Sequence, residues 1–386
     1  PFSTAQHSFP RQLFAVNRIS DFFHHDIPTL HIFIYWCCLI VAMGNSLHHG
    51  ISSSLPYRIR YNDSSLTELG LTTSLDEDEL KSVIQALPRN HTIRVVVMFD
   101  SFTSHVLQEP LQWNDFVRAL ASVSSLQQVE LLETCVPLES LRYLLEKPTL
   151  QTLAVTDGVE LGSVTYATIV ELGAALTTRN HPNGPLALSS LQEFVWECQF
   201  PTVENLLDPL LEAFTSSSHL KLLGLVNSST NIPTISVALL SPERLLEFST
   251  RQRSTLQTLD LSGCGLNDHH VQGICQGLQN GRKPCTMERL HLQRNEAVTK
   301  LHGWNTMLDF VKSNHHYLKS LLLTDMDTVF QEQVQLWMAW NRHVRQVLGE
   351  EPTPLALLFM IWRVKEQADF LFLLLREYPE IYMKNR

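Results

Sequence analysis

Residues 256–266 read Leu256-Gln-Thr-Leu259-Asp-Leu261-Ser-Gly-Cys264-Gly-Leu266, and this stretch decides the fold. It matches the pattern L-x-x-L-x-L-x-x-[NC]-x-L at every fixed position. The apolar residues at positions four and six alternate with polar ones, as in a strand that buries one face. One short strand cannot bury all of these leucines alone, so the pattern predicts a unit that packs against copies of itself.

The same spacing returns on both sides of this stretch. With the first apolar residue of each copy as position one, the copies begin at Leu66, Ile93, Leu126, Leu150, Leu191, Leu220, Leu256, Met287 and Leu318. Positions four and six are apolar in every copy, and successive copies begin 24 to 41 residues apart. The pattern is sharpest in the copies at Leu256 and Met287 and weakest in those at Ile93 and Leu191. It predicts nine strands in one register.

Between the copies, apolar residues recur at helical spacing, as at Leu138, Leu141 and Leu145. A strand plus a helix in about thirty residues resembles the ribonuclease-inhibitor-like class of leucine-rich repeats, over residues 64–327. The resemblance implies an α/β solenoid, a curved horseshoe with parallel strands on its concave face and helices on its convex face. We expect three parts: an N-terminal leader over residues 1–55, poorly ordered or hydrophobic, the solenoid over residues 56–327, and a C-terminal helical cap over residues 328–386.

Motifs of enzymes and cofactor sites are missing from the sequence. It lacks G-x-x-x-x-G-K-[ST], G-x-S-x-G, G-x-G-x-x-G and H-E-x-x-H. Histidine doublets such as His269-His270 cannot chelate through both rings without help, because adjacent side chains point to different sides. The seven cysteines form no C-x-x-C pair, which favours reduced thiols in an intracellular protein. We expect no enzyme activity, no cofactor and no metal.

The charge of the chain is unevenly distributed. The net charge is −10, with 11 basic and 23 acidic side chains in residues 51–250 and 16 basic and 14 acidic side chains in residues 251–386. An acidic surface repels the phosphates of a nucleic acid, whereas it attracts a basic protein. We therefore expect a basic protein partner and no nucleic acid. The cysteine pattern leads us to expect a cytoplasmic location.

The concave face is the candidate site for this partner. Side chains at positions three and five point away from the core, and position eight enters the turn after the strand. The charged residues at these positions are acidic in the middle copies and basic in the eighth copy. The candidate partner-binding residues are Glu130, Asp157, Glu193, Glu197, Asp260, Arg289, His291 and Arg294. The leading hypothesis is a non-enzymatic module that binds a protein partner on this face.

Two alternatives remain open. GTPase-activating proteins for a nuclear transport GTPase share this repeat class, so the chain could regulate a small GTPase. Alternatively, the fourteen-residue apolar run Leu30–Met43 could tether the chain to a membrane or direct it to the secretory pathway. Membrane contact is possible only through this run. In the secretory pathway the glycosylation sequons at Asn62, Asn90 and Asn227 would become relevant.

Overall fold

The structure is a computed structural model, and it describes residues 55–71, 77–99, 110–132, 138–156, 164–180, 191–228, 237–280, 284–313, 318–324, 326–345, 348, 353–365 and 367–379. All of these residues belong to the unit Ser54–Arg386. The apolar run Leu30–Met43 and nearly all of the expected leader lie outside the described residues.

The described residues form one open sheet of nine parallel strands in sequence order. The strands are β1 (Glu68–Leu71), β2 (Val95–Phe99), β3 (Gln128–Leu132), β4 (Thr152–Thr156), β5 (Glu193–Cys198), β6 (Leu222–Asn227), β7 (Thr258–Asp260), β8 (Arg289–Leu292) and β9 (Ser320–Leu323). Parallel neighbours need a crossover between them, which is why a helical segment follows each strand.

The predicted repeat register is confirmed on every strand. Position four of each copy pairs with position four of the next, through Leu69, Val96, Val129, Leu153, Phe194, Leu223, Leu259, Leu290 and Leu321. The side chains at positions one, four and six are buried in all nine copies, with no more than 4% of any of them exposed. Burial of one such side chain contributes about 1.5–3 kcal/mol, so this continuous core is the main stabilising element of the fold.

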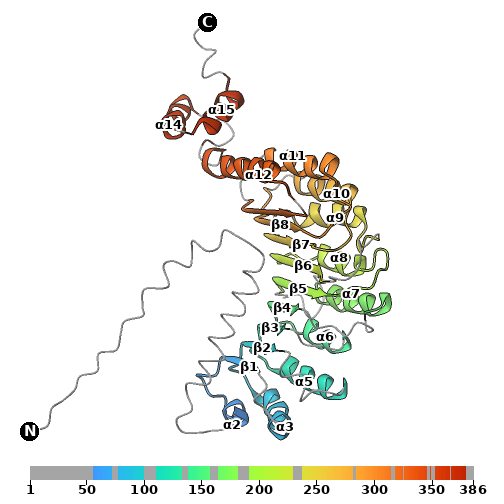
Figure 1. Cartoon of the computed structure of the whole chain (residues 1–386). Coiled ribbons are helices and arrows are strands. Elements are labelled where there is room, and N and C mark those ends of the chain that lie inside the picture. Colours follow the sequence, from blue (N-terminus) through green and yellow to red (C-terminus); the bar gives the residue numbers. More distant parts are fainter. Residues whose placement is uncertain are drawn as a thin grey trace, which may run out of the picture. The chain divides into compact units, whose positions relative to one another are not determined.

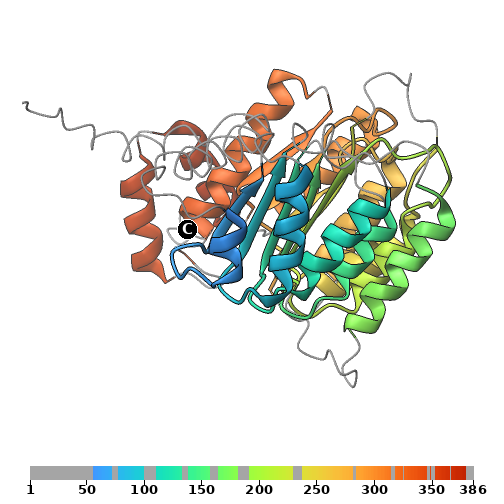
Figure 2. The same ribbon diagram turned by 90° about the horizontal axis from the view of Figure 1, so that it is seen from below.

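The helices form a second layer on one face of the sheet. They are α3 (Glu77–Ala86), α5 (Pro110–Ser122), α6 (Leu138–Leu145), α7 (Tyr166–Asn180), α8 (Asp208–Thr215), α9 (Pro242–Gln252), α10 (Asp268–Gln279) and α11 (Asn305–Lys312), with the short helices η3 (Leu87–Arg89) and η4 (Lys300–Trp304). Figures 1 and 2 show this layering of helices against strands. The fold is therefore an α/β stack of strand–helix units, consistent with a leucine-rich-repeat-like solenoid.

In two copies, the side chain at position nine joins the strand-end turn to the preceding repeat. In the seventh copy, the Cys264 thiol donates to the carbonyl of Leu225 at 3.0 Å. In the eighth, the Asn295 amide donates to the equivalent carbonyl of Leu261, also at 3.0 Å, and its oxygen accepts from the Leu266 amide. A thiol and an amide thus bind the same backbone position, which explains the alternation of Asn and Cys in the motif.

Two glycines allow α9 and α10 to approach closely. A Cβ atom at Gly273 would lie 2.9 Å from the carbonyl oxygen of Pro242, and one at Gly277 would lie 2.6 Å from the Cβ of Ser249. Real Cβ atoms do not come this close to other atoms. Glycine is thus required here because the neighbouring helix backbone occupies the space of a side chain.

The weak copy at Leu191 uses aromatic residues in place of leucine. Phe194 on β5 packs against Phe214 of α8, with 5.0 Å between ring centroids. Trp196 contacts Phe200 edge to face, at 5.1 Å. These side chains are larger than leucine, yet they occupy the same buried positions four and six.

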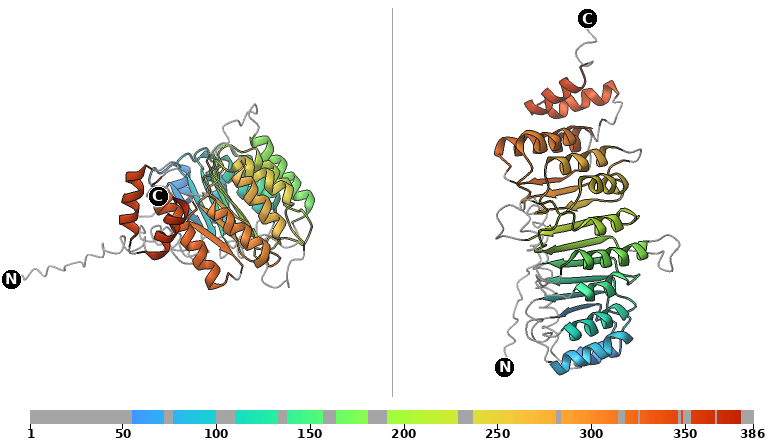
Figure 3. Two further views of the ribbon diagram at one scale, coloured as in Figure 1. Left: turned by 90° about the horizontal axis from the view of Figure 1, so that it is seen from above. Right: turned by 90° about the vertical axis from the view of Figure 1, so that its right-hand side faces the viewer.

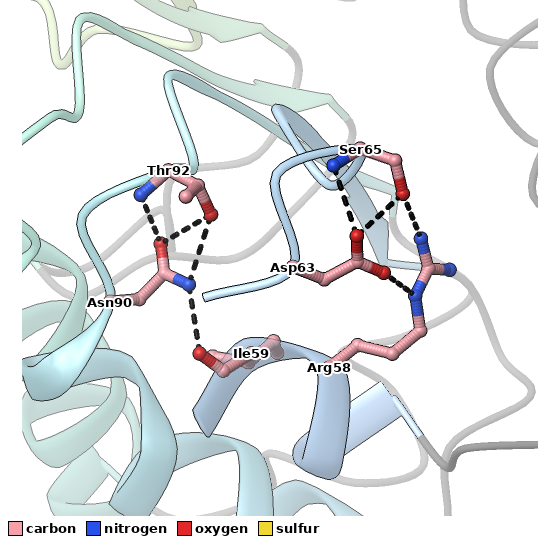
Figure 4. Close-up of polar contacts among 6 residues, drawn as sticks. All are labelled: Arg58, Ile59, Asp63, Ser65, Asn90 and Thr92. Atoms are coloured by element: carbon pink, nitrogen blue, oxygen red, sulfur yellow. Dashed lines mark hydrogen bonds and ion pairs between the residues drawn. The ribbon is translucent and has the colours of Figure 1, made fainter. Parts of the chain in front are cut away.

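Helix α2 (Leu55–Arg60) is held at the first repeat by polar contacts (Figure 4). The buried amide of Asn90 donates to the carbonyl of Ile59 at 2.8 Å. Arg58 Nε donates to Asp63 Oδ2 at 2.6 Å, and Ser65 donates to Asp63 Oδ1 at 2.7 Å. Hydrogen bonds from Ser65 and Arg58 lower the pKa of Asp63 to about 2. This contact network joins α2 to the turn before β1.

Beyond the ninth strand the described chain is helical. It contains α12 (Thr328–Trp340), the π-helix η5 (Asn341–Arg345), α14 (Pro354–Val364) and α15 (Ala368–Glu377). Figure 3 shows α14 and α15 beside α12, past the last repeat. Trp340 joins these segments, because its Nε1 donates to Glu377 Oε2 at 3.2 Å and its ring contacts Phe370 at 6.0 Å.

Candidate functional site

The candidate site is the strand face, by which we mean the side chains at positions three and five of the nine copies. Burial alternates along β1, β5, β8 and β9, most clearly on β5, where each buried residue follows a half-buried one. On β4 and β6 every residue after the first is buried. The core residues point toward the helices, so positions three and five lie on the opposite side of the sheet. Among the predicted site residues, Glu130, Glu193, Asp260, Arg289 and His291 occupy such positions.

Glu130 and Glu193 form an acidic pair on β3 and β5. Gln128 Nε2 donates to Glu130 Oε1 at 2.5 Å, and the Thr152 hydroxyl donates to Glu193 Oε2 at 3.3 Å. Burial raises the pKa of Glu130, the hydrogen bond from Gln128 opposes this rise, and the charge of Glu193 adds to it. The half-buried carboxyl of Glu130 is therefore costly to ionise unless a positive charge approaches it.

Asp260 and His291 form the second group, on β7 and β8. Asp260 Oδ1 accepts from the backbone amide of Ser262 at 3.0 Å and from its hydroxyl at 2.6 Å. His291 Nδ1 lies 3.5 Å from Asp260 Oδ2, and its Nε2 lies 3.3 Å from the hydroxyl of Ser320. The predicted acidic and basic ends of the face thus meet at this contact.

The structure does not bring all the predicted residues together. Asp260 lies four strands from Glu130, or about 19 Å at the usual strand spacing. Glu197 lies on β5 at position seven of the fifth copy and is half-buried. Arg294 is exposed in the turn after β8, with a positive φ of 58°. Asp157 lies outside the described residues. Any partner that contacts both groups must span several strands.

Apolar side chains also occupy the strand face, and the sequence analysis overlooked them. They lie at positions three or five and are half-buried: Val95, Val195, Leu222 and Leu322. Comparison of position five across the copies would have revealed part of this set, since that position holds Val195 and Leu322. The strand face is therefore a mixed surface of apolar and acidic side chains rather than a purely charged one.

The described cysteines and histidines have structural surroundings. Cys198, Cys264, Cys275 and Cys285 are free and buried, and burial raises the pKa of each thiol, which makes them poor nucleophiles. His270 of the His269-His270 doublet is buried. Its ring bonds Asn267 at the start of α10 and the carbonyl of Leu240 at 2.8 Å. No group of three or more potential metal ligands occurs within the described ranges.

The asparagines of two of the three sequons are buried. The side chains of Asn90 and Asn227 are each 2% exposed, and their amides donate to the carbonyls of Ile59 and Gly263. A glycan on either nitrogen would replace these hydrogen bonds and could not fit in the folded chain. In the part of the chain that the structure describes, no helix has the length and apolar character needed to cross a bilayer.

Comparison with known proteins adds little to this geometry. No protein-family model matches the chain, and no curated protein matches it. A similar solved structure is the tropomodulin C-terminal domain from Caenorhabditis elegans, with 12% sequence identity and a TM-score of 0.25. The match covers 45% of this chain and 82% of that domain. At this TM-score the similarity supports no conclusion, so the fold is established here by register and burial.

Proposed function

We propose that the chain is a non-enzymatic module that binds a basic protein partner through the strand face. The supporting observation is that carboxylates and apolar side chains share one sheet whose backbone is fixed by a continuous core. Long-range attraction between the carboxylates and a basic partner would speed association, and contact with the apolar side chains would slow dissociation. A nucleic acid does not fit this proposal, because its phosphates would meet Glu130 and Glu193.

The acidic pair is the part of the face that we expect to contribute most. Glu130 is half-buried with a raised pKa, so a lysine or arginine of the partner would relieve an unfavourable desolvation. A hydrogen bond between charged groups contributes about 1.5–3 kcal/mol, which corresponds to a change in affinity of roughly tenfold or more. The four buried free thiols are in keeping with a reducing compartment, and we propose the cytoplasm.

Charge reversal on the two faces of the molecule tests this proposal. A partner is first identified by proximity labelling with the full chain, and its Kd is then measured at low and high salt. We expect the triple variant Glu130→Lys, Glu193→Lys and Asp260→Lys to bind at least tenfold more weakly, with a smaller salt dependence.

The matched control carries the same change of charge on exposed helical positions, as Glu139→Lys, Glu171→Lys and Glu332→Lys. It should bind like the unmodified chain. A Glu130→Gln and Glu193→Gln variant guards against misfolding of the lysine variant. Equal loss of affinity in the strand-face and control variants, or no loss in either, would refute the proposal.

We also propose that α14 and α15 act as the C-terminal cap of the solenoid. The last repeat of a solenoid exposes an apolar edge that needs cover, and Trp340 at the end of α12 contacts Phe370 and Glu377 of α15. A chain that ends after residue 345 should self-associate in analytical ultracentrifugation. A stable monomer would argue against the cap.

A further inference from the structure

A groove lies between α12 and α15, away from the strand face. It has a volume of about 300 Å³, at the lower end of the range for ligand sites. Trp337 and Leu373 line it and are 6% and 4% exposed, so they form its floor. Phe372 also lines it but is 63% exposed. The groove thus offers an apolar floor and one aromatic wall to a large apolar side chain.

The charged residues that line the groove carry both signs. They are Lys312, Arg376 and Asp369, and Lys312 Nζ already pairs with Asp309 Oδ1 at 3.4 Å. The Arg376 guanidinium lies 5.3 Å from the ring centre of Trp337 and 5.9 Å from that of Phe372. Within the described residues, Arg376 takes part in no salt bridge. A guanidinium held against aromatic rings can still donate in its own plane to a carboxylate.

We propose that this groove binds a short acidic segment of a partner protein. In the complex, a large apolar side chain of the segment packs on Trp337, Phe372 and Leu373, while a neighbouring carboxylate binds Arg376. Because Lys312 is paired with Asp309 whereas Arg376 has no salt bridge among the described residues, Arg376 is the group that favours an acidic segment over a neutral or basic one. This preference is opposite to that of the strand face, so the chain would have two surfaces for two kinds of partner.

Short synthetic peptides and the full chain provide the test. The first peptide has a central tryptophan flanked by glutamates and aspartates, and matched peptides carry glutamines or lysines as flanks, or alanine in place of the tryptophan. Fluorescence anisotropy should detect binding of the acidic tryptophan peptide. The lysine and alanine peptides should bind roughly tenfold or more weakly, because each lacks one of the two interactions.

The variant Arg376→Gln should weaken binding of the acidic peptide roughly tenfold, and Arg376→Lys should weaken it less. Arg363→Gln is the matched control, since Arg363 is exposed on the adjacent helix α14 but does not line the groove. Thermal unfolding of each variant verifies that it is folded.

Three results would overturn the inference. The first is equal binding of acidic and neutral peptides, or no binding of any peptide at millimolar concentration. The second is an equal effect of Arg376→Gln and Arg363→Gln. The third is concentration-dependent dimerisation that Arg376→Gln abolishes, which would make a second copy of the chain the occupant. None of these results bears on the strand face, so the two proposals fail independently.

Discussion

Asn295 allows a quantitative test of the hydrogen bonds that join the strand-end turns. Its side chain is fully buried and donates to the carbonyls of Leu261 and Leu292 at 3.0 and 2.9 Å. Its oxygen accepts from the Leu266 amide at 3.0 Å. In the variant Asn295→Ala the amide of Leu266 loses this partner inside the protein, which costs about 1–3 kcal/mol, and the lost carbonyl contacts add about 1 kcal/mol.

We therefore expect Asn295→Ala to lower the free energy of unfolding by about 2–4 kcal/mol. Asn295→Cys should cost less than Asn295→Ala, because Cys264 shows that a thiol can bind the equivalent carbonyl one repeat earlier. Urea denaturation measures both values. Asn305→Ala is the control, since Asn305 is exposed at the start of α11, and surface changes stay within about 0.5 kcal/mol. If alanine and cysteine at position 295 are equally tolerated, the reasoning is wrong.

Three further predictions concern other parts of the fold. Gly277→Ala should destabilise the chain by about 1–3 kcal/mol in urea denaturation, because the new Cβ would clash with Ser249 of α9. Alanine is the better helix former, so increased stability would show that the clash is absent. The raised pKa of Glu130 means that the unmodified chain loses stability as pH rises from the ordinary glutamate pKa to the raised pKa of the folded state. Glu130→Gln should remove this loss. Urea midpoints that depend on pH in the same way in both chains would contradict the prediction. Asp63→Asn should speed hydrogen exchange in α2 at neutral pH. In the unmodified chain, exchange in α2 should speed up only as pH falls from about 4 toward 2, because the lowered pKa of Asp63 stabilises the folded state above this pH range. Identical exchange in both chains would disprove the role of Asp63.

The repeat register could be predicted from the sequence because leucine at positions one, four and six reports a single local requirement, burial on one side of a short strand. The same requirement is met by Phe194 and Trp196, but there the sequence signal is weak. Their fit depends on Phe214 and Phe200, which lie further along the chain. Local pattern therefore identifies the strand, whereas the packing partner explains the unusual residue.

The candidate site was predictable only in part. Alternation along a strand placed Glu130 and Glu193 correctly on the outer side of the sheet, since that geometry depends on residue number alone. The contact of Asp260 with His291 requires knowledge of which strands are neighbours. Burial of His270 could not be inferred either, because it depends on the carbonyl of Leu240 in the preceding segment.

The buried cysteine thiols of the solenoid provide a way to measure local opening of its repeats. Cys198 lies in the fifth repeat, and Cys264, Cys275 and Cys285 lie in the seventh. Each thiol is shielded from reagents while its repeat is closed. The rate at which an alkylating dye modifies each one therefore measures how often that repeat opens. Peptide mass mapping of the four sites would compare how often the fifth and the seventh repeats open, without any introduced probe.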